Sequence, residues 1–151
     1  MLQYPLSLGY DDALEATGPC DTFDPTARTD ASNFIVEGEA ILVLTTHPNV
    51  TWNINAALVS DPTNFVPITE DVWQKGVGYF CFSPIVPSIP ASWIGQPAVL
   101  QLRQHAPDGT LYQVSPQLSA SGEQTEDGLY IQLTTSGVLP SHLSTVQWTT
   151  E

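Results

Sequence analysis

The chain has 151 residues, of which 42% are apolar, and this length and composition suit one domain with a buried core. Sixteen acidic residues against three basic ones give a formal net charge of -13, which disfavours binding to nucleic acid or to an anionic membrane surface. Charged residues amount to only 13% and aromatic residues recur along most of the chain, so the composition excludes a disordered polyanion.

Residues 1–30 combine several breakers of regular structure with short polar stretches. The breakers are Pro5, Gly9, Gly18, Pro19 and Pro25. A helix of normal length does not fit between them, so we predict a loop that wraps around the rest of the domain.

From residue 35 onwards the hydrophobic residues follow patterns that are typical of β-strands. The clearest strands are expected at 40–45, 51–59, 77–82, 98–104 and 110–114. The last two flank Ala106-Pro107-Asp108-Gly109, which supplies a turn, so they form the clearest hairpin. Three prolines between 84 and 90 are expected to prevent regular pairing there, and the polar stretch 119–127 is expected to be a loop.

Weaker strand patterns follow at 129–134 and 146–149. Many short strands with turn signals about every ten residues, and no amphipathic helix, predict an all-β chain. The expected fold is a single antiparallel, immunoglobulin-like β-sandwich with long loops over residues 1–151. No stretch approaches the roughly eighteen apolar residues of a membrane-spanning helix, so no membrane span is expected.

Cys20 and Cys81 permit one disulfide, which we expect to form; two free thiols are the alternative. The scarcity of lysine, the thirteen prolines and a glycosylation sequon at Asn49 together indicate a secreted or cell-surface glycoprotein, in which a disulfide is expected to form. The region 1–9 lacks the basic and apolar parts of a signal peptide.

Sequence motifs for the common catalytic sites are absent. The chain has no glycine-rich phosphate loop, no paired cysteines and histidines of a zinc site, and no Gly-x-Ser-x-Gly serine elbow. Of the three histidines, His105 beside the hairpin turn and His142 in a late polar segment are expected to be solvated. His47 lies between two predicted strands, at an edge or turn where functional side chains tend to occur.

Several phrases occur in an order that resembles the fungal, Bim-type copper acquisition factors, which have a lytic polysaccharide monooxygenase-like fold. The resemblance covers about residues 2–115, so 116–151 forms a C-terminal extension with one or two possible strands. The phrases are Leu2-Gln3-Tyr4-Pro5, Gly18-Pro19-Cys20 with Phe23, Thr46-His47-Pro48, Asp61-Pro62-Thr63-Asn64-Phe65, Gly78-Tyr79-Phe80-Cys81 and Pro107-Asp108-Gly109-Thr110-Leu111-Tyr112-Gln113.

The resemblance implies copper binding through a histidine brace, for acquisition rather than catalysis. In such a brace an N-terminal histidine gives its α-amine and imidazole, and an internal histidine, matched by His47, gives a third nitrogen. The alignment places the terminal histidine about two residues before Met1, outside this chain. Where the family commonly has Tyr-Gln-Cys-Ala-Asp, this chain has Val114 and Pro116 in place of the cysteine and a possible carboxylate ligand. The implied partners are a copper ion and a cell-wall or copper-transport component.

Two other hypotheses stay open. A non-catalytic interaction or carbohydrate-binding module that has lost the copper site would use exposed aromatic residues, for which Trp73 and Trp93 are the candidates and Trp52 is expected in the core. An oxidative enzyme acting on polysaccharide would need the same copper brace, which His47 alone does not supply. His47 as a plain strand-end residue needs no metal at all.

Overall fold

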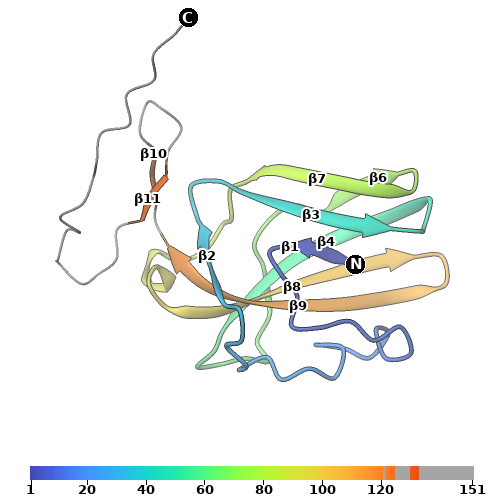
Figure 1. Cartoon of the computed structure of the whole chain (residues 1–151), viewed down its shortest axis with the longest axis horizontal. Helices are drawn as coiled ribbons and strands as arrows, with labels where there is room; N and C mark the ends of the chain where they lie inside the picture. The colour runs from blue at the N-terminus through green and yellow to red at the C-terminus, as the bar shows by residue number, and fades with distance from the viewer. Residues whose placement is uncertain (121, 125–129, 133–151) are drawn as a thin grey trace, which may run out of the picture.

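Two β-sheets pack against each other around one apolar core (Figure 1). The computed structural model describes residues 1–120, 122–124 and 130–132. Within these residues the chain is all-β, and its helical content is one 3-10 turn, η1 (Ala91–Trp93). No helix of the described residues is long and apolar enough to cross a membrane. The predicted β-sandwich is confirmed.

The smaller sheet has three antiparallel strands in the order β1-β3-β7. They are β1 (Leu2–Tyr4), β3 (Glu39–Thr45) and β7 (Gly78–Ile85). In β3 the buried residues Ile41, Val43 and Thr45 alternate with half-buried ones, as expected for a strand with one face in the core. Leu2 of β1 is opposite Val43, so the start of the chain is a strand of this sheet.

The larger sheet has six strands and mixed pairing. Its path is β2-β9-β8-β4-β5, and β6 also pairs with β4. The strands are β2 (Ser32–Ile35), β4 (Asn49–Leu58), β5 (Val66–Pro67), β6 (Val72–Lys75), β8 (Pro97–Ala106) and β9 (Gly109–Ala120). All pairs are antiparallel except β2 with β9. A separate antiparallel pair, β10 (Gly122–Gln124) and β11 (Tyr130–Gln132), follows.

Alternation along β4 explains how the two sheets meet. Trp52 and Ile54 are buried at 3% and 1% exposure and face the smaller sheet, where the Trp52 ring meets Phe82 edge to face at 6.0 Å. Further along β4, Ala57 on the opposite face is also buried, because the N-terminal segment covers that end of the sheet. The predicted core position of Trp52 is confirmed.

The N-terminal segment is a wrapping loop, as predicted, with β1 at its start. It docks on β9 through a hydrogen bond from the Leu8 nitrogen to the Val114 carbonyl at 2.8 Å and through one from the Ser115 hydroxyl to the Leu6 carbonyl. Phe23 and Leu8 pack on the small cluster beneath. The loop also accepts a hydrogen bond from the Tyr112 nitrogen at the Glu15 carbonyl, at 2.7 Å, so it lies along β9, whereas Trp73 on β6 stays exposed.

Several predicted boundaries were wrong. β7 continues through Pro84 to Ile85, because Pro84 lies on an edge strand where the register shifts, and the pairing with β3 resumes at Ile85. β9 continues to Ala120 and β10 follows, where 119–127 had been assigned to a loop. The short strands β1, β2, β5 and β6 carry too little pattern to be found from the sequence. The predicted strand at 146–149, His142 and Trp148 lie outside the described residues.

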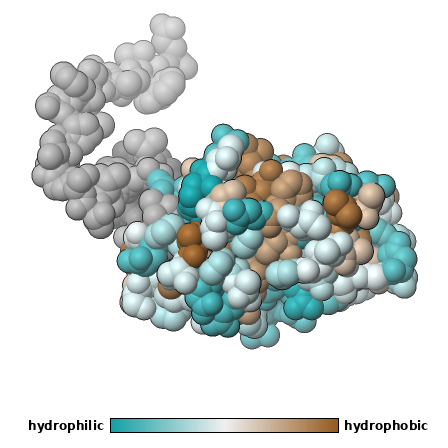
Figure 2. Space-filling model, turned by 90° about the horizontal axis from the view of Figure 1, so that it is seen from below, coloured by the Kyte–Doolittle hydropathy of each residue, from teal (hydrophilic) through white to brown (hydrophobic). Residues whose placement is uncertain are grey.

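Exposed apolar side chains interrupt an otherwise hydrophilic surface. Figure 2 shows one face on which apolar side chains gather between hydrophilic ones. Among the described residues the most exposed large apolar side chains include Trp73 at 66%, Tyr79 at 67% and Val77 at 62%. An aromatic ring that folding leaves this exposed is available for contact with a ligand.

Candidate functional site

His47 lies in the short connection between β3 and β4, at one open end of the sandwich. Its backbone nitrogen donates to the Thr45 hydroxyl at 3.1 Å, and Thr45 is itself buried at the end of β3. The predicted turn position of His47 is confirmed. The connection is therefore fixed to the core strand that precedes it.

Asp108, in the β8–β9 turn, contacts the His47 ring. The His47 Nε2 atom and the Asp108 Oδ2 atom are 3.0 Å apart. The hydrogen bond with His47 lowers the pKa of Asp108 below its usual value. The hairpin predicted from Pro107-Asp108-Gly109 is confirmed, and its turn brings a carboxylate to the histidine from 61 residues away.

A depression of about 310 Å³ surrounds this pair. Met1 and Glu15 also line it, as does Tyr10. The Met1 nitrogen donates to the Leu44 carbonyl, which continues the β1–β3 ladder toward His47. Burial lowers the pKa of the Met1 α-amine, and the charge of Glu15 acts in the opposite direction.

The acidic groups around the depression influence one another. Burial raises the pKa of Glu15, Asp12 raises it further, and the Met1 amine and His47 lower it. A hydrogen bond from the Tyr10 hydroxyl to Asp12 at 2.8 Å raises the pKa of Tyr10 to about 12. The depression thus combines one imidazole and one amine with several carboxylates. Sequence reasoning missed Glu15 and the role of Asp108, although Asp108 lay within a quoted motif.

The kinds of donor atom around the depression suit copper, but there are too few of them to hold the ion. Imidazole nitrogen, amine nitrogen and carboxylate oxygen all suit Cu(II). Within the described residues, however, no group of three or more His, Cys, Asp or Glu side chains is placed to hold a metal ion. His47 and Asp108 would supply two ligands, and further nitrogen donors would have to come from the N-terminal side of β1.

The substitution by proline at position 116 does not affect this end of the sandwich. Pro116 is buried and pairs with Val99, six residues along β9 from Thr110 beside the turn. Six residues of strand span about 20 Å. A carboxylate at 116 would therefore be remote from His47, whereas Asp108 is in contact with it.

The predicted Cys20–Cys81 disulfide is wrong, because both cysteines are free. Cys20 is buried under the N-terminal loop in a cluster with Ala57, Val99 and Val114, on the outer side of the larger sheet. Cys81 is exposed on β7 of the smaller sheet. Both sheets therefore lie between the two cysteines. Burial, with a smaller effect of Asp24, raises the pKa of Cys20 to about 11.

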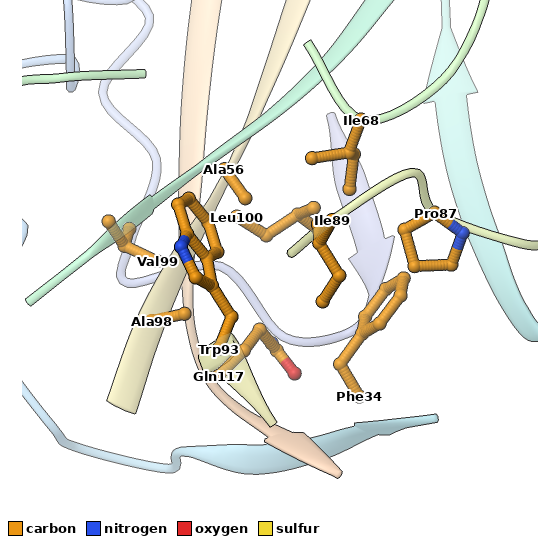
Figure 3. A pocket seen from close by; sticks show the side chains of 10 residues that line it. All are labelled: Phe34, Ala56, Ile68, Pro87, Ile89, Trp93, Ala98, Val99, Leu100 and Gln117. Atoms are coloured by element: carbon orange, nitrogen blue, oxygen red, sulfur yellow. The ribbon is translucent and has the colours of Figure 1, made fainter. Parts of the chain in front are cut away.

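The other predicted site residues lie away from the depression. Asn49 is exposed at the start of β4, where its sequon is accessible. Trp73 is exposed on β6, whereas Trp93 is half-buried against the core. Trp93 lines an apolar cavity of about 20 Å³, roughly the space for one water molecule. Figure 3 shows the Trp93 ring beside Ala56, with Ile68 and Phe34 on the other sides of the cavity.

A comparison with models of protein families shows which family the chain belongs to. The model of the family described as copper acquisition factor BIM1-like matches residues 1–115. The chain belongs to this family. The match ends within β9, so it includes β1, His47, Asp108 and the wrapping loop. No curated protein matches the chain. Membership in the BIM1-like family indicates a role in copper acquisition.

Proposed function

We propose that this protein is a secreted or cell-surface copper-binding protein that holds copper in a histidine brace for acquisition rather than catalysis. One observation carries the proposal: the N-terminal end of β1 points toward His47. In the β1–β3 register, Leu2 is opposite Val43 and the Met1 nitrogen bonds to Leu44. A residue two positions before Met1 would therefore lie opposite Thr46, next to His47.

A histidine at that position would complete the donor set. Its α-amine and imidazole would add two nitrogens to the imidazole of His47, which gives the three nitrogens of a brace. Asp108, already 3.0 Å from His47, would orient that ring or add an oxygen ligand. Copper is the cargo in this proposal, and no polysaccharide oxidation follows from it.

The test compares chains that differ only in what precedes Met1. One form begins at Met1, the second carries histidine two positions before Met1, and the third carries glutamine there. Copper(II) titration by calorimetry and electron paramagnetic resonance is then made on each. We expect one tightly bound copper with nitrogen ligands in the histidine form alone.

Substitutions in the histidine form assign the ligands. His47→Ala should weaken copper binding by at least about 100-fold, because it removes a ligand, and the loss of a group that only hydrogen-bonds to a ligand already costs about 10- to 100-fold. His105→Ala is the matched control and should leave the affinity unchanged, since His105 bonds to Thr110 and Asn53 instead. Equal binding by the Met1 and histidine forms, or by His47→Ala, would contradict the brace. N-terminal sequencing of the naturally secreted protein checks the proposed location and start.

A further inference from the structure

The outer face of the larger sheet presents two cross-strand rows of side chains. Directly opposed residues of antiparallel strands point to the same face of a sheet. One row runs from β6 through β4 to β8, and the next continues from β4 through β8 to β9. The rows are Trp73–Thr51–His105 and Asn53–Arg103–Tyr112, and we call these six residues the outer platform.

Trp73, on β6, is the exposed member of the platform, whereas Tyr112, on β9, lies under the N-terminal loop, where its nitrogen donates to the Glu15 carbonyl at 2.7 Å. Trp52 and Ile54, between the platform residues of β4, are buried in the core, so the platform residues face away from the sandwich interior. The strands β6, β4, β8 and β9 are neighbours in the sheet. Three inter-strand steps of about 4.8 Å give the platform a width of about 14 Å.

Hydrogen bonds hold the polar groups of the platform in place. The His105 Nδ1 atom lies 2.9 Å from the Thr110 hydroxyl, and its Nε2 atom bonds to the Asn53 side-chain oxygen. Asn53 in turn donates to Asp71 at 2.6 Å. A ligand that meets groups already ordered in this way loses less free energy to ordering them on binding.

The guanidinium of Arg103 has a buried nitrogen without a hydrogen-bond acceptor among the described residues. The guanidinium carbon lies 5.7 Å from the centre of the Tyr112 ring, and the buried nitrogen is the Nε atom. Tyr112 is held from the other side by Gly18, where an added Cβ would come within 2.8 Å of the Tyr112 Cζ atom. The buried Nε is out of reach of a ligand, so the guanidinium would donate to an oxygen acceptor from its terminal nitrogens.

The combination fits a neutral polysaccharide. A sugar ring has an apolar face that can stack on Trp73, which is 66% exposed, and hydroxyl groups that both donate and accept hydrogen bonds. The platform has one cation, Arg103, beside amide, imidazole and hydroxyl groups, and the Asp71 carboxylate lies next to it, bonded to Asn53. The net charge of -13 opposes an anionic polymer.

We propose that the outer platform binds a neutral polysaccharide, with a sugar ring stacked on Trp73 and its hydroxyl groups bonded to Asn53 and Arg103. This inference goes beyond copper binding and does not depend on it. His105 of the platform pairs with Thr110, one pair away from the end of the β8–β9 hairpin, and the turn of that hairpin carries Asp108. Polysaccharide on the platform would therefore hold the His47 end of the protein at a cell wall.

The test uses the full chain made in a bacterial host, so that Asn49 stays unmodified. Its binding to insoluble β-1,3-glucan, cellulose and chitin is measured by depletion from solution, with polygalacturonate as the anionic probe. Trp73→Ala should weaken binding to the preferred neutral polymer at least about tenfold, and Arg103→Gln should weaken it as well. Tyr79→Ala removes an equally exposed ring from the other sheet, at 67% exposure, and should bind as the unchanged chain does.

Three results would overturn the proposal: no binding to any neutral polymer, equal losses in Trp73→Ala and Tyr79→Ala, or preference for polygalacturonate. Thermal unfolding of each variant shows whether it is folded. Copper titration of Trp73→Ala is made in the form that carries histidine two positions before Met1. The affinity for copper should not change, which shows that polysaccharide binding and copper binding use different residues. A chain with histidine two positions before Met1 that binds no copper but still binds the neutral polymer would refute the brace and leave the platform proposal standing.

Discussion

Val114→Cys should create the disulfide that the Cys20 site lacks. Cys20 packs in one buried cluster with Val114, and the family resemblance places a cysteine at position 114. The bond would close a loop of about 95 residues, which in the chain-entropy model stabilises by about 4.7 kcal/mol. For a chain of this size that free energy corresponds to a rise of about 9–19 °C in Tm, as an upper value before any strain in the native state is subtracted.

The assay is thermal unfolding of Val114→Cys with and without reductant, combined with a count of free thiols, in a background of Cys81→Ser. We expect no reactive thiol in the oxidised protein and a Tm that falls on reduction. Val99→Cys is the comparison, since Val99 belongs to the same cluster. Failure of Val114→Cys to form the bond, or a bond at Val99→Cys instead, would refute the placement of Cys20 against position 114.

Three further predictions concern buried and exposed groups. Alkylation at pH 8 should modify exposed Cys81 first and leave Cys20 unmodified in the folded protein, as peptide mapping would show, because Cys20 is buried and its pKa is about 11. Asp21→Asn should stabilise the fold at pH 7 by about 1–3 kcal/mol in denaturant titrations, because it removes the charge of a carboxylate that is fully buried. Burial raises the pKa of Asp21 in the fold. Its contribution is therefore fully present below the unfolded pKa of about 3.9 and is lost as the pH rises through the folded pKa, so the gain from Asp21→Asn should vanish in acid. Trp52→Phe should cost about 1–3 kcal/mol in the same assay, because it leaves the buried Gln74 oxygen without the Trp52 Nε1 donor at 2.8 Å; an unchanged free energy of unfolding would contradict the bond.

The sequence predicted the strands whose pattern depends on burial of one face. Trp52 and Ile54 alternate with polar residues in β4, and the turn at Pro107-Asp108-Gly109 specifies the β8–β9 hairpin, so both were found with small errors at the ends. The short strands β1, β2, β5 and β6 were missed because two to four residues carry too little pattern, and β1 and β2 also pair with strands distant in the sequence. The disulfide prediction failed for a related reason: two cysteines in one chain carry no information about which layer each occupies.

By itself, the amino-acid sequence determined the all-β class, the acidic surface that disfavours polyanions, and His47 as the candidate copper ligand. These properties follow from composition, local periodicity and an ordered series of motifs. Only the tertiary structure decided that Asp108 contacts His47, that position 116 is remote from it, and that Trp73 is exposed while Trp93 packs on the core. Each of those facts depends on strand register and sheet packing, which join residues far apart in the chain through contacts that no local pattern encodes.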